Sequence, residues 1–207
     1  MGLEILKGAR IGCAMTGSFC TFKKAFDMWR SLRAAGAELY PIMSFNARRL
    51  DTRFYRAQEA ASVFEEITGR GIWDSIPAVE PIGPKKLLDL MIVAPCTGNS
   101  LAKIAMGITD TPATLAVKSH LRNGKPVLIA VSSNDGLSRS AKNLGELLTA
   151  KNVFFSPFEQ DDWTGKPSSL VADFGKIPEA AAAALENRQI QPVLATKEKY
   201  EGEKKAK

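Results

Sequence analysis

The residues best suited to chemistry follow an apolar run in the middle of the chain. Residues 90–94 are continuously apolar, as expected for a strand that is buried on both faces. Thr97, Asn99 and Ser100 then form a compact polar turn, after which apolar residues return at helical spacing. The free N–H groups and positive dipole at such a helix start can bind an anion, and Gly98 would allow close approach. The same residue types are the usual helix N-caps, so anion binding and capping both stay open.

Two further polar turns also follow apolar segments. Residues 16–21 come after one predicted strand, and residues 132–136 come after another. If the strands are parallel, all three turns open on the same edge of the sheet, where ligands bind in such folds. The first turn lacks the glycine spacing of a dinucleotide-binding loop. An ordinary strand-to-helix turn at 16–21 and a simple Asn-Asp-Gly turn at 134–136 remain the alternatives.

These turns must be positioned by strands that alternate with helices. Pro95 is predicted to end the central strand, because proline cannot donate to a ladder. Strands are predicted at 9–15, 37–43, 87–94, 127–131 and 153–156, and helices at 22–35, 58–68, 101–106, 111–121, 138–150 and 168–187. Residues 71–85 and 161–167 are predicted to be loops. The pattern indicates an α/β fold, a three-layer, Rossmann-like, doubly wound parallel sheet.

Length and composition favour a single globular unit. The chain has 207 residues and a net charge of +6, part of which comes from a polar tail. We expect one domain at 1–195 and a charged, disordered tail at 196–207. No apolar run reaches membrane-spanning length and no signal-peptide core is visible, which favours a cytoplasmic protein without membrane contact. Basic residues are interspersed with acidic ones, which argues against nucleic-acid binding.

The cysteines and the single histidine do not indicate a metal site. Cys13, Cys20 and Cys96 lack metal-ligand spacing, and with His120 alone no zinc site is expected. Cys13 lies in an apolar run and should be buried. Cys20 and Cys96 lie in the turns expected to face a ligand, where packing and thiol reactivity are both open. His120 lies near a predicted helix end and is expected to be a structural or surface residue.

Residues 95–110 carry the most specific pattern, P-x-T-x-N-S-x-A-K-I-A-x-G-I-x-D. It closely resembles the P-A-T-A-N-T-x-x-K-x-A-x-G-I-x-D stretch of homo-oligomeric flavin-containing cysteine decarboxylase-like flavoproteins. Residues 16–23, T-G-S-F-C-T-F-K, are similar to the T-G-G-I-A-A-Y-K loop of that family, with Ser18 in place of the second glycine. Residues 130–137 look like its A-P-A-M-N-x-x-M segment, and Asn134 is retained. The resemblance covers about residues 8–190 and implies a flavoprotein fold.

The resemblance implies FMN as the ligand. The residues expected to bind it are Thr16, Gly17, Ser18, Phe19, Thr97, Asn99, Ser100, Ser132 and Asn134. Ser18, Thr97, Asn99 and Ser100 would hold the phosphate, with the ring near Phe19 and Ser132. The decarboxylases of the family carry a catalytic histidine in the helix after the second strand, and residues 58–68 contain none. Cysteine decarboxylation is therefore not expected, and the catalytic residues stay unassigned.

Within the family, the resemblance is strongest to members that make dipicolinate in spore-forming bacteria. It implies one chain of an enzyme that oxidises dihydrodipicolinate together with a second chain, which would carry the NAD(P) site. It also implies a homo-oligomer, a trimer or a dodecamer, in which an apolar face at 111–121 would pack between copies. A non-catalytic flavin- or phosphate-binding assembly module and a prenylated-flavin synthase-like transferase are the alternatives.

A group of arginines offers a second binding hypothesis. Arg48, Arg49, Arg53 and Arg56 lie close together in the sequence. Arginine binds carboxylates with two parallel hydrogen bonds, so these side chains would suit a small dicarboxylate substrate. A solvated polar face is the alternative.

Overall fold

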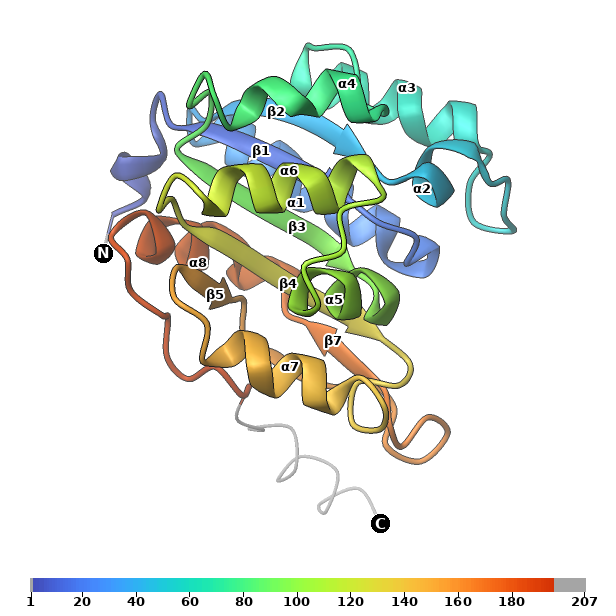
Figure 1. Cartoon of the computed structure of the whole chain (residues 1–207). Coiled ribbons are helices and arrows are strands. Elements are labelled where there is room, and N and C mark those ends of the chain that lie inside the picture. The colour runs from blue at the N-terminus through green and yellow to red at the C-terminus, as the bar shows by residue number, and fades with distance from the viewer. Residues whose placement is uncertain (1, 196–207) are drawn as a thin grey trace.

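The computed structural model describes residues 2–195, and its centre is a sheet flanked by helices (Figure 1). The strands are β1 (Arg10–Met15), β2 (Glu38–Met43), β3 (Leu90–Cys96), β4 (Val127–Ser133), β5 (Val153–Phe155), β6 (Phe158–Gln160) and β7 (Leu170–Ala172). Their order is β2-β1-β3-β4-β7-β6, and β5 also pairs with β4. Strands β1 to β5 pair in parallel, whereas β7 runs antiparallel to β4 and β6. The α/β class is confirmed, with a sheet that is mostly rather than wholly parallel.

Helices cover both faces of this sheet. They are α1 (Phe22–Ala34), α2 (Phe45–Arg49), α3 (Ala57–Thr68), α4 (Ile76–Val79), α5 (Gly98–Ala105), α6 (Pro112–Leu121), α7 (Ala141–Leu148) and α8 (Ile177–Leu185). In Figure 1, α5, α6 and α7 lie in front of the sheet, and α1 and α8 lie behind it. The chain passes from β1 outward to β2 and then back to β3 on the other side of β1. The strand order therefore reverses between β1 and β3, where ligands bind in doubly wound folds.

The apolar patterns of the sequence form the core. All seven residues of β3 are buried, which explains why its sequence is continuously apolar. The stripe predicted for α1 packs inward, and Phe22 and Trp29 are fully buried. Full burial of an aromatic side chain of this size contributes about 1.5–3 kcal/mol. Gly36 and Gly69 have φ values of +88° and +67°, which confirms that each ends its helix in a left-handed conformation.

Several predicted boundaries were wrong. Strand β3 continues through Pro95 to Cys96, where its register with β4 shifts between Val93 and Cys96. At this irregularity the pairing with β4 does not require a backbone N–H from residue 95. Pro95, which has no N–H, therefore does not end the strand. Strand β4 likewise extends beyond the predicted residue 131 to Ser133.

Two predicted segments have a different structure. The helix predicted from residue 168 instead starts at Ile177, because residues 170–172 form β7 in a hairpin with β6. The loop predicted at 71–85 contains α4 and a 3₁₀ turn at Glu80–Ile82, both with proline in the first turn. Proline is favourable in a first helical turn, so these prolines start short helices rather than preventing them.

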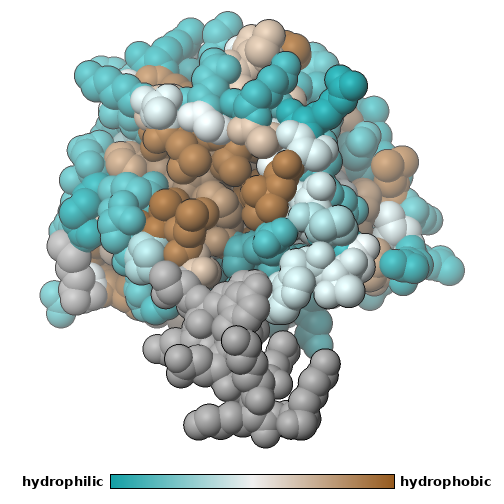
Figure 2. Space-filling view, turned by 90° about the horizontal axis from the view of Figure 1, so that it is seen from below, coloured by the Kyte–Doolittle hydropathy of each residue, from teal (hydrophilic) through white to brown (hydrophobic). Residues whose placement is uncertain are grey.

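The apolar face predicted at 111–121 is already covered within the chain. Ala113, Ala116, Val117 and His120 of α6 are all buried in the protomer, so this helix offers little apolar surface to another copy. A different face, seen from below, has a contiguous apolar area bordered by hydrophilic side chains (Figure 2). No helix within residues 2–195 combines the length and the apolar character that crossing a membrane requires. The predicted tail at 196–207 lies outside the described residues.

Candidate functional site

The ends of β1 and β3 are joined by a threonine. The Thr16 hydroxyl donates to the Pro95 carbonyl at 2.8 Å and accepts from the Thr97 backbone N–H at 2.9 Å. The Thr16 N–H also donates to the Pro95 carbonyl, at 3.2 Å. Thr16 is 1% exposed, so its side chain fixes the two strand ends against each other. The Thr16 hydroxyl, which was predicted to bind a ligand, thus forms hydrogen bonds within the chain and holds the ends of β1 and β3 together.

The turns after β1 and β4 meet through two serines. The hydroxyl groups of Ser18 and Ser132 are 2.8 Å apart, although 114 positions separate the residues in the sequence. Ser18 has φ −90° and ψ 71°, so its Cβ is accommodated without left-handed strain in place of the family glycine. The predicted convergence of these two turns is therefore present in the structure.

A cleft opens beside this serine pair. It has a volume of about 490 Å³, and we call it the open cleft. Its lining residues are Gly17, Ser18, Phe19, Cys20, Thr21, Lys24, Phe54, Thr97, Gly98, Ser132, Ser133, Asn134, Asp161, Lys166, Ser169, Leu170 and Val171. It combines hydroxyl and amide groups with two phenyl rings and two ammonium groups. Such a mixture suits a flat, polar or anionic ligand.

A second cavity of about 320 Å³ adjoins the open cleft. The two share Gly17 and Thr97, which therefore lie between them. Asn99 and Ser100 line only this second cavity, together with residues from the segment after β2 that include Ser44. The structure thus divides eight of the nine predicted residues between two neighbouring cavities, and the ninth, Thr16, lines neither because it is buried between the ends of β1 and β3.

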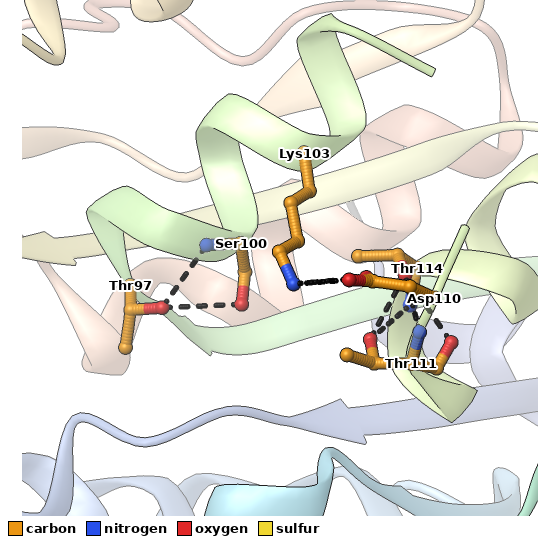
Figure 3. Close-up of polar contacts among 6 residues, drawn as sticks. All are labelled: Thr97, Ser100, Lys103, Asp110, Thr111 and Thr114. Carbon is orange, nitrogen blue, oxygen red and sulfur yellow. Dashed lines mark hydrogen bonds and ion pairs between the residues drawn. The ribbon is translucent and has the colours of Figure 1, made fainter. Parts of the chain in front are cut away.

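Six polar residues between the start of α5 and the first turn of α6 are drawn in Figure 3, and all of them except Thr114 line the second cavity. We call this group the α5–α6 wall and define it as Thr97, Ser100, Lys103, Asp110, Thr111 and Thr114. The Thr97 hydroxyl accepts from the Ser100 N–H at 3.2 Å, and Thr111 and Thr114 form a reciprocal capping box at the start of α6. The capping alternative of the sequence analysis is therefore confirmed for Thr97.

An ion pair connects the two helices of this wall. The Lys103 ammonium lies 2.9 and 2.8 Å from the two carboxylate oxygens of Asp110 (Figure 3). Thr97 also donates to the Ser100 hydroxyl at 3.1 Å. Many of the hydrogen-bonding groups in the motif at residues 95–110 are thus paired with other residues of the same motif.

Gly98 has a different role from the predicted one. A Cβ at this position would lie 2.6 Å from side-chain oxygens of Ser133 and Asp135 and 2.8 Å from that of Ser140. These three side chains are hydrogen-bonded to one another through the Asp135 carboxylate. The missing side chain therefore makes room for the loop after β4, and the small residue is explained by packing within the chain.

The cysteines and the histidine have distinct environments. Burial raises the pKa of the Cys96 thiol to about 12 and also raises the pKa of Cys13, so both act as packing residues. Cys20 is exposed and lines the open cleft. His120 is buried, and burial lowers its pKa to about 4 while its Nε2–H donates to the Pro126 carbonyl at 3.1 Å. The structural role expected for His120 is confirmed.

The predicted arginine group lies outside the open cleft. Arg48 pairs with Asp74 at 3.0 Å, and the guanidinium groups of Arg49 and Arg53 lie over the rings of Phe45 and Phe54. None of the four arginines is among the residues that line either cavity within the described chain. Their binding to a dicarboxylate stays a prediction, and the arrangement favours a solvated face.

The sequence analysis missed several residues of the cleft. Lys24, Phe54, Lys166 and Leu170 come from three separate segments, and no local motif joins them. The β6–β7 hairpin contributes the last two, and each of its strands has only three residues. One local signal for a cationic wall was available at the start of α1. Lys23 and Lys24 are adjacent there, and the first turn contains no acidic residue.

The fold and these cavities can now be compared with known proteins. The family model described as Flavoprotein matches residues 3–184. The chain belongs to the flavoprotein family. The match spans every strand of the sheet and all the residues that line the two cavities.

Within this family, the chain is similar over almost its whole length to B subunits of dipicolinate synthase. The chain is 43% identical to the dipicolinate synthase B subunit of Bacillus subtilis (strain 168), over 97% of this chain and 99% of that protein. The crystal structure of the dipicolinate synthase B subunit from Bacillus halodurans C has a TM-score of 0.85 and 40% identity, covering 93% of this chain and 98% of that one. By this similarity, the flavoprotein is a homologue of the B subunits of dipicolinate synthase.

A more distant flavoprotein shares only the fold. The FMN-dependent cysteine decarboxylase SpaF has a TM-score of 0.66 and 21% identity, covering 88% of this chain and 98% of its own. This chain therefore shares its architecture with SpaF, whereas it shares both architecture and much of its sequence with the B subunits.

Proposed function

We propose that this chain is the flavin-binding B subunit of a two-chain dipicolinate synthase, which oxidises dihydrodipicolinate to dipicolinate in the mother-cell cytoplasm of a sporulating bacterium. The observation that carries the proposal is the contact between Ser18 and Ser132, which joins two separate turns into one ligand-sized cleft at the switch point. The similarity of nearly the whole chain to B subunits of dipicolinate synthase supports the choice of reaction.

The two adjoining cavities suit FMN. Gly17 and Thr97 lie between them, so one elongated ligand can extend through both. Ser18, Thr97, Asn99 and Ser100 would hold the phosphate, since hydroxyl groups that already donate can still accept or rearrange. Phe19 is half-buried against Phe22, with ring centroids 5.2 Å apart, and offers an apolar face beside the flavin ring. When bound, FMN supplies a two-electron acceptor.

The reaction removes a hydride and a proton from a dihydropyridine ring. The flavoprotein's own residues would orient that ring in the open cleft and exclude water from it, with the apolar side chain of Leu170 on the ring and the hydroxyl group of Ser132 at its edge. The sequence has no dinucleotide fingerprint after β1. We therefore assign the NAD(P) site to the partner chain, the A subunit of the synthase.

Assembly is part of the proposal. The apolar area seen in Figure 2 is exposed in the single chain, and contiguous exposed apolar surface commonly marks an interface. We propose that a homo-oligomer, a trimer or a dodecamer, or the partner chain covers it. Native mass spectrometry of this chain by itself and together with the partner chain measures this directly. A monomer under both conditions would remove the assembly part.

The flavin site is tested at Asn99, which is exposed in the second cavity. Asn99→Ala should lower FMN affinity at least fivefold in a fluorescence titration, while the thermal unfolding midpoint stays unchanged. Gln58→Ala on α3, which is exposed and outside both cavities, is the matched control. If wild-type protein takes up no FMN, or if both variants bind it equally, the assignment of the second cavity to the phosphate fails.

A non-catalytic assembly module is the second candidate. The internal pairing of the α5–α6 wall favours it, because residues such as Lys103 and Asp110 already satisfy each other. The two functions separate in an assay of dihydrodipicolinate oxidation with each chain by itself and with both. Activity only in the mixture supports the catalytic role, whereas full activity of the partner chain by itself supports the module.

A further inference from the structure

Two lysines from distant parts of the chain line the open cleft. Lys24 lies in the first turn of α1, and Lys166 lies in the loop between β6 and β7. The other walls include the rings of Phe19 and Phe54 and the apolar side chain of Leu170. The Asp161 carboxylate also lines the cleft and pairs with Lys166. The cleft therefore combines two cationic groups and one carboxylate with apolar surfaces, and this lining of net positive charge suits an aromatic or dihydroaromatic ring that carries acidic groups.

Lys24 occupies an electrostatically unfavourable position. The N-terminal turn of α1 carries the positive end of the helix dipole, and this turn contains no acidic residue. Within residues 2–195, no carboxylate lies within ion-pair distance of the Lys24 ammonium. A cation placed here is destabilising by itself, and an anionic ligand in the cleft would relieve that cost.

Lys166 is held in place by its own loop. Its N–H donates to the Asp162 carbonyl at 2.7 Å, and its carbonyl accepts from the Ser169 N–H at 2.9 Å. The ammonium group lies 3.6 Å from the Asp161 carboxylate, and both side chains are about half exposed. Such a half-exposed pair contributes little to stability, so a ligand carboxylate can replace Asp161 at low cost.

We infer that Lys24 and Lys166 each bind one of the two carboxylates of the substrate in the open cleft. The inference rests on the proposed function, which supplies a planar ring with two carboxylates. It differs from the arginine hypothesis, since Arg48 is already paired with Asp74 and the arginine group lies outside the cleft. Each ammonium would form a charge-assisted hydrogen bond to one carboxylate, and the pair would select for dicarboxylates over monocarboxylates.

The test is a calorimetric titration with two probes, pyridine-2,6-dicarboxylate and pyridine-2-carboxylate, in buffer without divalent cations. Titrations are made on the full chain with the partner chain present, for the wild type, Lys24→Gln, Lys166→Gln and the double variant. We expect each single variant to weaken dicarboxylate binding roughly tenfold and the double variant roughly a hundredfold, as for loss of one and two charge-assisted contacts. The preference over the monocarboxylate should shrink in each single variant.

Lys23→Gln is the matched control, because Lys23 is exposed, adjacent to Lys24 and absent from the cleft lining. It should bind both probes like the wild type. Wild-type affinity in Lys24→Gln and Lys166→Gln overturns the inference, as does a wild type that does not bind the dicarboxylate. FMN titration of the same variants separates the two proposals. A selective loss of FMN affinity would assign the lysines to the flavin phosphate instead, while loss of the flavin site in the wild type concerns the proposed function alone.

Discussion

The two sides of the site use their polar residues in different ways. In the α5–α6 wall, Thr97, Thr111 and Lys103 each have a partner within the wall itself. In the open cleft, Asn134 is exposed and Lys24 lacks a carboxylate partner within the described chain. The wall is paired within itself, whereas the cleft adds unpaired polar groups to its own Ser18–Ser132 and Lys166–Asp161 contacts.

This difference explains the pattern of resemblance. The residues that match the family most closely, 95–110, build the wall, whereas the turns at 16–23 and 130–137 match more loosely and line the cleft. A wall whose side chains satisfy each other tolerates few changes, because each substitution leaves a partner unpaired. Cleft residues are free to vary with the ligand. The most recognisable motif therefore builds a self-paired structural unit beside the open cleft.

The largest expected effect comes from His120, which lies in the last turn of α6 and outside the wall. Its folded pKa of about 4 lies below the ordinary value of about 6.5, so the unfolded state binds the proton more tightly. The stability is therefore complete above pH 6.5 and declines as the pH falls toward 4, with a loss of about 2 kcal/mol at pH 5. Urea denaturation of the wild type and His120→Gln at pH 7.5 and pH 5 measures it. An equal loss in both proteins would remove His120 as the cause.

A smaller effect compares one hydroxyl from each side. Thr97→Ala should destabilise the protein by about 1 kcal/mol, because α5 loses its N-cap, and Thr97→Ser should restore most of it. Ser132→Ala on the cleft side should cost less than about 0.5 kcal/mol, since its Ser18 partner can turn to water. Chemical denaturation gives all three values. A larger loss from Ser132→Ala than from Thr97→Ala would reverse the comparison.

The smallest effect concerns the ion pair of the wall. A double-mutant cycle with Lys103→Gln and Asp110→Asn should give a coupling free energy of about 0.2–1 kcal/mol, because the Asp110 side chain is 56% exposed to solvent. The coupling should fall when the salt concentration is raised, as screening requires. A coupling that is independent of salt would mean that packing rather than charge joins α5 to α6.

The sequence was informative where a pattern is local and long. The buried strand at 90–94 and the apolar stripe of α1 are of this kind, and so are the glycine ends of α1 and α3. Strands β6 and β7 have three residues each, too few to show the alternation of apolar and polar residues that marks a strand. The cleft residues of the β6–β7 hairpin were therefore not predicted. Anion binding and capping at Thr97 could not be separated, because both use the same hydroxyl and N–H groups. Lys24 and Lys166 meet only through the fold.

The contact of Gly98 with the loop after β4 has a consequence for charge. Asp135 brings a carboxylate close to the first residue of α5, whose backbone end is electropositive. The chain thus supplies its own counter-anion at that helix end. Any phosphate that binds there must come from a direction that Asp135 does not occupy, and withdrawal of the loop would strengthen the helix as an anion acceptor. The position of the loop after β4 therefore affects the anion affinity of the α5 N-terminus, and the loop can lie this close because residue 98 has no Cβ.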